Sequence, residues 1–219
     1  GCDEQDSEHA HVLAKRYQFV SCAGIHPHNA KDASPDFEAH LRRLANHPEV
    51  VAIGECGLDY NRDFSPRPQQ RDVFARQLAL ANELNLPVYL HERDAHDDML
   101  AIVKEYCPKG VLHCFTGTGE QAQRYIDLGL SLGITGWVCD ERRSQDLNAA
   151  LAVIPLERVL IETDAPYLLP RTIRPKPKSR RCEPAHLNYV VSHLSAHYGV
   201  SEEQVRTITT QNFQQLFMK

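Results

Sequence analysis

The sequence predicts an α/β protein folded as a TIM-like (β/α)8 barrel, and three observations carry this prediction. Strand-like apolar runs alternate with helical patterns along the chain, which indicates parallel strands joined by helical crossovers. The runs are bounded by loops and read as strands buried on both faces. Four of them end on a histidine or a carboxylate, and barrel enzymes place catalysis at the carboxyl ends of their strands.

The elements follow one another in a regular order over the 219 residues, which we treat as one domain, 1–219. Strands are predicted at 19–25, 50–55, 87–91, 110–114, 130–134 and 158–163. Helices are predicted at 7–17, 34–44, 65–84, 96–106, 120–128, 144–152, 184–198 and 201–216. The pattern at 7–17 reads as the end of a helix.

Several helix starts are predicted from capping residues. Ser34 is expected to cap the second helix, with Pro35 in its first turn, and the pair Ser65-Pro66 is expected to cap the third. Ser201 and Gln204 have the spacing of a capping box at the last helix.

Six predicted strands are fewer than the eight of a complete barrel, which typically needs about 250 residues. Because the sequence starts inside a helical pattern, we expect a barrel shortened at its N-terminus. The alternative is a six-stranded, open, doubly wound sheet. That alternative does not explain why the polar residues fall at the carboxyl ends of the strands.

The composition is that of an ordinary globular protein, with 42% hydrophobic and 24% charged residues. The net charge of −5 argues against a surface that binds nucleic acid everywhere, so any such contact must be local. No apolar run approaches the roughly 20 residues of a membrane helix, and the polar N-terminus does not resemble a signal segment. We expect a monomer that does not associate with a membrane.

The seven cysteines are scattered, odd in number and without a CxxC pair. Free thiols inside strand-like runs behave as small buried hydrophobes. A reducing setting, the cytoplasm, or the nucleus in a eukaryote, fits this usage better than a disulfide framework.

The four strands that end on polar residues indicate a metal site. In 50–60, VVAIGECGLDY, a strand places Val51 and Ile53 on the face of the carboxylate that follows them. The terminal residues of the four runs are Glu55, His91, His113 and Asp164. Imidazoles and carboxylates are ligands of divalent metals, and two cations about 4 Å apart can clamp a phosphoryl group and activate water. One such residue alone could be a hydrogen-bonded core histidine, but four in phase predict a shared pocket.

Three more residues are expected near this pocket. Glu162 shares a strand face with Asp164 and lies two residues deeper, so we expect it to pair with a ligand histidine or a cation. The alternative is that the strand ends early and Glu162 is solvated. His26 and His28 follow the first strand, and substrate contact, support of the ligands and a plain loop role all stay open.

The segment 170–184, PRTIRPKPKSRRCEP, is strongly basic. Six lysines and arginines stand against one acid, Glu183, in a loop that leaves the last strand. Asp140-Glu141-Arg142-Arg143, after another strand, adds two more arginines. A local cationic strip on an acidic protein suits a phosphate-backbone substrate. A solvated run of charges is the alternative.

The motifs IGECGLDY, PVYLHER, VLHCFTGT, LGITGWVCDERR and LIETDAPYLLP, with GIHPH and TQNFQQLF, resemble the TatD family of metal-dependent deoxyribonucleases. The resemblance covers nearly the whole chain in order. It implies a TIM-like barrel and a divalent-metal nuclease that acts on DNA, often from the 3′ end, in DNA repair or breakdown. It also implies one or two metal ions per chain, Mg2+ in the first place and Mn2+ or Zn2+ as alternatives.

The resemblance also implies roles for single residues. Glu55 would bridge the metals, His91 and His113 would hold one metal, and Asp164 would bind metal and orient or deprotonate the attacking water. His26, His28, Arg181 and Glu183 would support the substrate groove. Family members begin with a strand that often carries an HxH motif, which this sequence does not show.

Two other functions remain open at this stage. The same barrel could hydrolyse an amide, a lactone or an aminoacyl ester, and the basic segment is what separates this from a nuclease. A chain without the first strand could also be an inactive binding form.

Overall fold

The computed structural model describes residues 1–218, which form two compact units. The first comprises Gly1–Leu112 with Leu216–Met218, and the second comprises residues 113–215. All described strands that pair are parallel, and helices connect them, so the α/β class is confirmed. In residues 1–218 no helix is long and apolar enough to cross a membrane.

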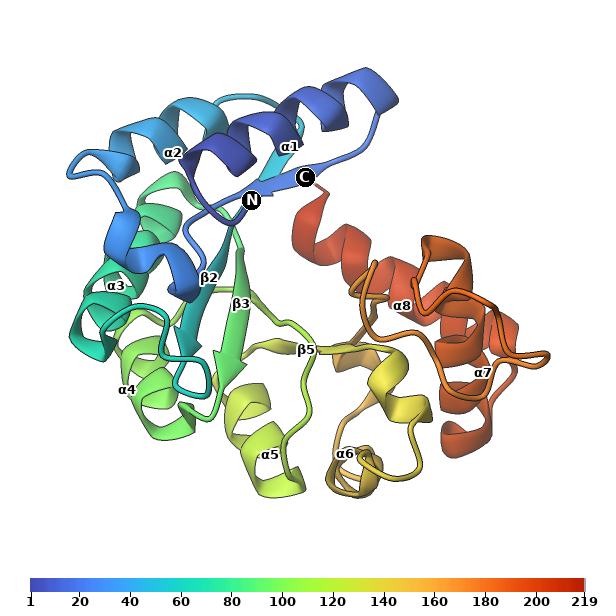
Figure 1. Cartoon of the computed structure of the whole chain (residues 1–219). Helices are drawn as coiled ribbons and strands as arrows, with labels where there is room; N and C mark the ends of the chain where they lie inside the picture. Colours follow the sequence, from blue (N-terminus) through green and yellow to red (C-terminus); the bar gives the residue numbers. More distant parts are fainter. Residues whose placement is uncertain (219) are drawn as a thin grey trace. The chain divides into compact units, whose positions relative to one another are not determined.

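The first unit contains four parallel strands in the order β1-β2-β3-β4 (Figure 1). The strands are β1 (Ser21–Ala23), β2 (Val50–Asp59), β3 (Val88–Arg93) and β4 (Gly110–Leu112). The helices are α1 (Glu4–Tyr17), α2 (Phe37–Ala45), α3 (Arg67–Leu84) and α4 (His96–Tyr106). Helix α3 packs on β2, and α1 lies beside α2. The buried side chains of Phe37, Phe74 and Leu78 fill the space between helices and strands.

Strand β2 is longer and less regular than predicted. It continues past Glu55 to Asp59. Gly54 pairs with Tyr89 and Cys56 with Leu90, so Glu55 is the extra residue of a β-bulge. A bulge re-aims a side chain that simple alternation would place elsewhere, and such irregularities are frequent beside active sites.

The second unit contains the parallel pair β5 (Ser131–Ile134) and β6 (Val159–Ile161). Its helices are α5 (Gly119–Asp127), α6 (Gln145–Ala150), α7 (Leu187–Tyr198) and α8 (Glu202–Phe217, whose last two residues cluster with the first unit). The predicted capping box of α8 is confirmed, because Ser201 N–H donates to Gln204 Oε1 and Gln204 N–H donates to Ser201 Oγ, at 2.9 and 3.2 Å.

Three predicted helix starts were wrong. Helix α1 is whole and begins at Glu4, because the Asp3 side chain accepts the Asp6 N–H. Helix α2 starts after Asp36 instead of Ser34. Ser65 does not cap α3; its hydroxyl donates to the His28 carbonyl at 2.9 Å and accepts the Lys31 N–H at 3.1 Å. The Ser65 hydroxyl is thus used by the 3₁₀ helix Pro27–Asp32 and not by α3.

Candidate active site

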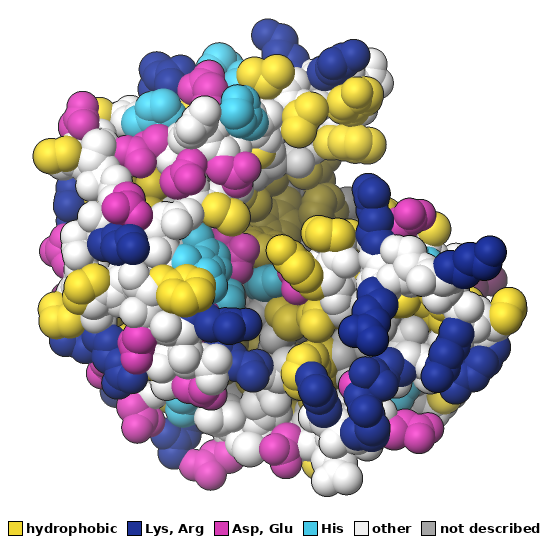
Figure 2. All heavy atoms as spheres, viewed as in Figure 1, with side chains coloured by type: hydrophobic (Ala, Val, Ile, Leu, Met, Phe, Trp, Pro, Cys, Tyr) yellow, Lys and Arg dark blue, Asp and Glu magenta, His cyan; other side chains and the backbone are white. Residues whose placement is uncertain are grey.

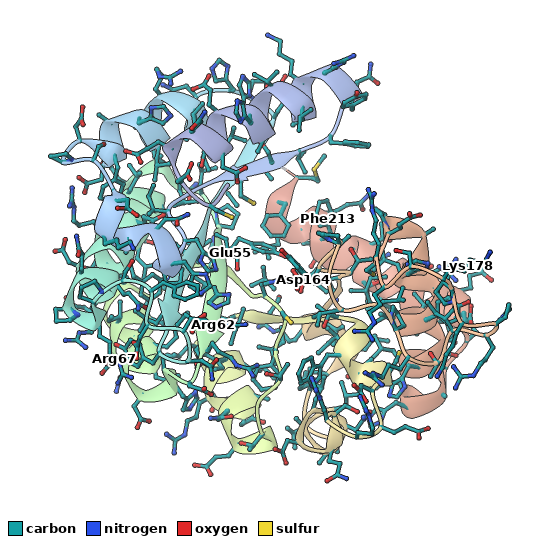
Figure 3. The ribbon with its side chains drawn as sticks, in the orientation of Figure 1. Glu55, Arg62, Arg67, Asp164, Lys178 and Phe213 are labelled. Carbon is teal, nitrogen blue, oxygen red and sulfur yellow. The ribbon has the colours of Figure 1, made fainter. Side chains whose placement is uncertain are left out.

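The first unit brings three potential metal ligands together at β2 and β3. One donor atom each of His26, Glu55 and His91 lies within 4.8 Å of the others. His91 Nδ1 lies 3.0 Å from Glu55 Oε1, and His26 Nε2 lies 3.5 Å from the same oxygen. The bulge in β2 presents Glu55, labelled in Figure 3, and its Oε1 atom lies near a nitrogen of both rings.

The 3₁₀ helix Pro27–Asp32 sets the positions of two histidines, His26 as its N-cap residue and His28 in its first turn. His26 Nδ1 accepts the His28 N–H at 3.2 Å, which leaves His26 Nε2 to face Glu55. His28 Nε2 lies 2.6 Å from an oxygen of Asp59. Both histidines therefore lie beside carboxylates of β2, and their role in substrate contact or in support of the ligands stays a prediction.

Asp59 is a site residue that sequence reasoning missed. Its side chain is only 4% exposed, and Oδ2 lies 3.5 Å from His91 Nε2 as well as against His28. Oδ1 accepts the N–H groups of Asn61 and Arg62 at 3.0 and 2.8 Å. The available signal was the apolar pattern that continues through Gly57 and Leu58 to a second carboxylate.

The charges of this cluster suit a cation. Burial alone would raise the pKa of Asp59, but hydrogen bonds from His91, the Arg62 N–H and His28 hold it well below its ordinary value. Burial alone would lower the pKa of His91, but the Asp59 and Glu55 carboxylates raise it to about 9. Burial lowers the pKa of His26. The cluster thus stabilises positive charge between two carboxylates, as a divalent ion requires.

The second unit holds a comparable cluster after β4 and β6. Donor atoms of His113, Cys114 and Asp164 lie within 4.8 Å of one another. His113 Nε2 lies 3.5 Å from Asp164 Oδ1, and His113 Nδ1 lies 2.9 Å from Glu162 Oε2. Burial raises the pKa of the Cys114 thiol to about 11.

Glu162 is placed to orient His113. Strand β6 ends at Ile161, earlier than predicted, yet the Glu162 side chain is only 9% exposed and is not solvated. Its Oε2 also accepts the Cys114 N–H at 3.0 Å. A carboxylate that accepts both bonds keeps the proton on His113 Nδ1 and turns the Nε2 lone pair toward Asp164.

Gly133 makes room for this carboxylate. A Cβ atom added to Gly133 would collide with the Glu162 carboxylate. The glycine of the LGITG motif in β5 therefore serves as a cradle for Glu162. A residue with a side chain at this position would push Glu162 away from His113.

The basic side chains of the 170–184 segment and of Asp140-Glu141-Arg142-Arg143 divide into two groups by their contacts. Arg171 lies 2.9 Å and Arg142 3.2 Å from the Asp140 carboxylate, which is nearly buried. Arg174 donates to the carbonyls of Arg171 and Ile173. Within residues 1–218, the remaining basic side chains of the segment are exposed and form no salt bridge: Lys176, Lys178, Arg180 and Arg181. Figure 2 shows dark blue side chains gathered over this segment, drawn orange in Figure 1, and Lys178 points outward in Figure 3.

Glu183 follows this segment and has a local contact. Its N–H donates to His186 Nδ1 at 2.9 Å, in a reciprocal cap of the 3₁₀ helix Pro184–His186. Both Arg181 and Glu183 are exposed.

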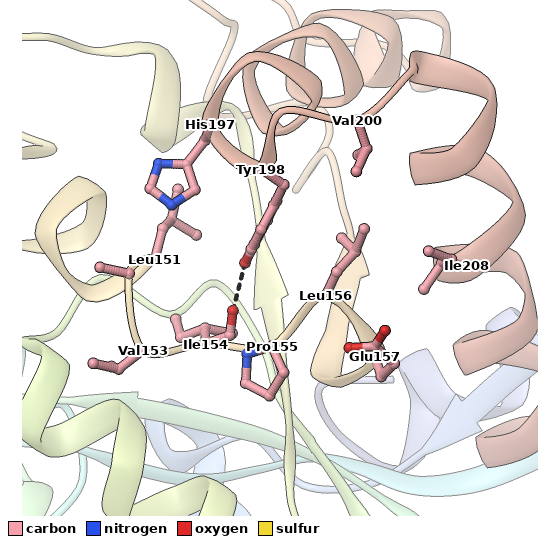
Figure 4. Close-up of a pocket in the computed structure, with 11 residues that line it drawn as sticks. Leu151, Val153, Ile154, Pro155, Leu156, Glu157, His197, Tyr198, Val200 and Ile208 are labelled. Carbon is pink, nitrogen blue, oxygen red and sulfur yellow. Dashed lines mark hydrogen bonds between the residues drawn. The ribbon is translucent and has the colours of Figure 1, made fainter.

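Of two pockets, one lies away from the candidate ligands and the other lies beside them. A groove of about 600 Å³ in the second unit is lined by apolar residues near Ile154 and α7, where the Tyr198 hydroxyl donates to the Ile154 carbonyl at 2.7 Å (Figure 4). It contains no predicted site residue. A pocket of about 410 Å³ in the first unit is lined by Glu55, Tyr89 and Phe19, so it adjoins the carboxylate cluster.

The structure therefore assembles the predicted residues in two groups. Within the first unit, Glu55 and His91 meet with His26 and His28. Within the second unit, His113 meets Asp164 and Glu162. The prediction that the four ligands share one centre stays a prediction.

Comparison with known proteins places the chain in a family. A family model described as TatD related DNase matches residues 1–218. A 3'-5' ssDNA/RNA exonuclease TatD from Pantoea vagans (strain C9-1) is 50% identical over 222 residues, which cover 99% of this chain and 85% of the relative. The protein of the same description from Klebsiella pneumoniae (strain 342) is 48% identical over 221 residues, 99% of this chain and 84% of the relative.

Solved structures agree with this assignment. The crystal structure of a TatD homologue from Escherichia coli K12 matches with a TM-score of 0.89 and 28% identity, over 99% of this chain and 84% of that one. The predicted TIM-like α/β fold is confirmed by this likeness. The chain belongs to the TatD-related DNase family of hydrolases.

Proposed function

We propose that this protein is a divalent-metal-dependent 3′–5′ exonuclease that hydrolyses the phosphodiester bonds of single-stranded DNA, and of RNA as well. The observation that carries the proposal is the pair of histidine–carboxylate clusters at the carboxyl ends of strands. The names of the relatives support the polarity and the single-stranded substrate. A cytoplasmic role in DNA repair or degradation is part of the proposal.

The metal ligands that we propose are Glu55 and His91 in the first unit and His113 and Asp164 in the second. A mixed set of carboxylates and imidazoles suits Mg2+ or Mn2+ through its oxygens and Zn2+ through its nitrogens. We propose Mg2+ as the ion in use, one or two per chain. When bound, such an ion polarises a phosphoryl oxygen and lowers the pKa of water.

The side chains of the protein have distinct tasks in this proposal. Asp164 accepts the proton of the attacking water. Glu162 keeps His113 in the tautomer whose Nε2 lone pair faces outward. Asp59 holds His28 and His91 in position through its buried carboxylate. Glu55 would hold metal together with His91, and the family resemblance implies a bridging role for it.

Substrate contacts are proposed for exposed groups near each cluster. Phe64 is 55% exposed, and its ring centroid lies 4.8 Å from that of His28, so a base of a single strand can stack on it. Arg181 and the other exposed basic side chains of the 170–184 segment would contact phosphates, with Glu183 at its end. This local positive charge lets a protein of net charge −5 hold a polyanion.

Replacing Glu162 by alanine is expected to lower kcat by roughly 10- to 100-fold and to raise the half-activating metal concentration, because His113 loses the acceptor of its Nδ1 proton. Glu162→Gln should restore part of the activity, since an amide oxygen can still accept from His113 and Cys114. Metal titrations of steady-state rates measure both effects. Glu157→Ala, an exposed carboxylate of the same unit, is the control and should behave as the unmodified protein. Unchanged kinetics in Glu162→Ala would contradict the orienting role.

Neutralising four exposed basic side chains tests the choice of substrate. The variant Lys176→Gln, Lys178→Gln, Arg180→Gln, Arg181→Gln should raise KM for single-stranded DNA on the order of tenfold at low salt. The slope of log(kcat/KM) against log salt should flatten by about 0.7 for each phosphate that the variant no longer binds. Hydrolysis of a small phosphodiester should be unaffected.

The matched control removes equal charge from another surface: Lys15→Gln, Arg16→Gln, Lys104→Gln and Lys109→Gln, all exposed. Equal effects in both variants would show that only net charge matters. A protein that cleaves no nucleic acid with any divalent ion but hydrolyses an amide, lactone or aminoacyl ester would replace the nuclease proposal. A protein that binds single strands without cleaving them would support the inactive form.

A further inference from the structure

A third group of potential ligands lies in the first unit, outside the cluster around Glu55. It consists of His11 in α1 and of His47 and Glu49 in the turn between α2 and β2. One donor atom of each lies within 4.8 Å of the others. Figure 2 shows histidine side chains gathered over α1 and α2. None of the three residues lies in the motifs that identify the family.

His11 is the unusual member of this group. It is 6% exposed, and within residues 1–218 its Nδ1 atom is buried without a hydrogen-bond partner. The nearest acidic oxygen, Glu49 Oε2, lies 3.9 Å from Nδ1, which is too far for a hydrogen bond. Buried polar atoms are nearly always satisfied, so an unmet nitrogen that faces a carboxylate points to a missing ion between them.

The backbone that carries the other two ligands is fixed. His47 N–H donates to the Leu44 carbonyl at 3.0 Å, and the His47 carbonyl accepts the Val50 N–H at 3.0 Å. The Glu49 carbonyl accepts the Ser21 N–H of β1 at 2.7 Å. The turn is therefore held against the sheet, and only side chains need to adjust on binding.

To bind one ion, the side chains of His11 and Glu49 must move only slightly, whereas the ring of His47 must rotate. Tetrahedral zinc ligands lie roughly 3.4 Å apart, given metal–ligand bonds of about 2.1 Å. The 3.9 Å between His11 and Glu49 must close by about half an ångström. The His47 ring stacks on His11 with centroids 4.1 Å apart, and it must turn out of the stack to direct a nitrogen at the same point. His47 and Glu49 are both partly exposed, which permits these movements.

We propose that His11, His47 and Glu49 bind one divalent cation of the zinc class, with water completing the coordination. Two imidazoles and one carboxylate are a known zinc ligand set, whereas Mg2+ prefers oxygen ligands and keeps its waters. Another carboxylate of the helix pair, Glu8, forms a salt bridge with Arg43 at 2.6 Å. The bound ion would join α1 to the start of β2 and stabilise this part of the first unit.

The test counts zinc bound by the whole chain at one buffered free zinc concentration. His47→Gln and Glu49→Gln should each bind one equivalent fewer than the unmodified protein, and each should lose part of the zinc-dependent rise in Tm. Neither variant touches the proposed nuclease ligands, so hydrolysis with Mg2+ should not change. The control is His40→Gln, which lies in α2 and pairs with Glu8 but is outside the group, and it should keep the full zinc count.

Two results would overturn the proposal. One is an undiminished zinc count in both His47→Gln and Glu49→Gln. The other is an equal loss in His40→Gln, which would show that the effect comes from the helix pair. Both polar variants change partly exposed side chains, so the folded state is retained and the count is interpretable. An inactive nuclease that still loses one zinc in these variants would leave the proposal standing, because the two sites share no residue.

Discussion

His91→Ala and Asp164→Ala are each expected to lower divalent-dependent hydrolysis of single-stranded DNA on the order of a thousandfold. A metal ion contributes several kcal/mol of charge stabilisation in the transition state, and each 1.36 kcal/mol is a factor of ten in rate. Each variant removes a proposed ligand, His91 from beside Glu55 and Asp164 from beside His113. Steady-state rates with Mg2+, Mn2+ and Zn2+ measure the loss.

Two controls separate loss of the site from loss of the fold. His9→Ala and Asp146→Ala remove an exposed imidazole and an exposed carboxylate, and both should retain full activity. Cooperative thermal unfolding shows whether His91→Ala and Asp164→Ala are folded. Undiminished cleavage by both of these would remove the basis of the ligand assignment, and loss in only one would restrict it to that unit.

Gly57→Ala is expected to reduce the free energy of unfolding on the order of 3 kcal/mol or more. Gly57 has φ of 147°, and an added Cβ would collide with the His91 carbonyl oxygen on β3. The variant must therefore strain its backbone and also break part of the β2–β3 pairing. Denaturant titration followed by circular dichroism measures the change in midpoint.

The matched variant for Gly57→Ala is Gly129→Ala. Gly129 also has a positive φ, 87°, but nothing lies within 4 Å of the added Cβ. Backbone strain alone should cost about 1 kcal/mol there. If the two variants were equally stable, close approach of β2 to β3 would not be the reason for the glycine at position 57.

The sequence predicted the architecture because its signals were local and repeated. Apolar runs at regular intervals identified the strands, and polar residues at their ends identified the ligand candidates. Within the first unit His91 lies beside Glu55, and within the second unit Asp164 lies beside His113, as expected from polar residues late in neighbouring strand patterns. The capping box of Ser201 and Gln204 could also be predicted, because it depends on two residues that are close in sequence.

Asp59 was missed although the strand pattern continues to it, because its place in the cluster depends on a bulge that the pattern does not show. The bulge at Glu55 shifts the register of β2, and Gly57 lets the strand run close against β3 beyond the predicted end. From local sequence alone, a glycine at this position predicts the end of the strand. Ser65 failed as a cap for a related reason, since a partner distant in sequence, the His28 carbonyl, takes its hydroxyl.

The Asp140 carboxylate has a consequence for how the basic segment would work. Arg142 and Arg171 share the single negative charge of Asp140, and because Arg171 begins the 171–181 loop, its ion pair with Asp140 fixes where the loop begins. The charge left over for an incoming strand sits farther along the loop, on the exposed side chains from Lys176 to Arg181. The residue that holds the loop in place and the residues that would bind the nucleic acid are thus different. Removing Asp140 would release the loop and leave the positive charges of the loop unchanged.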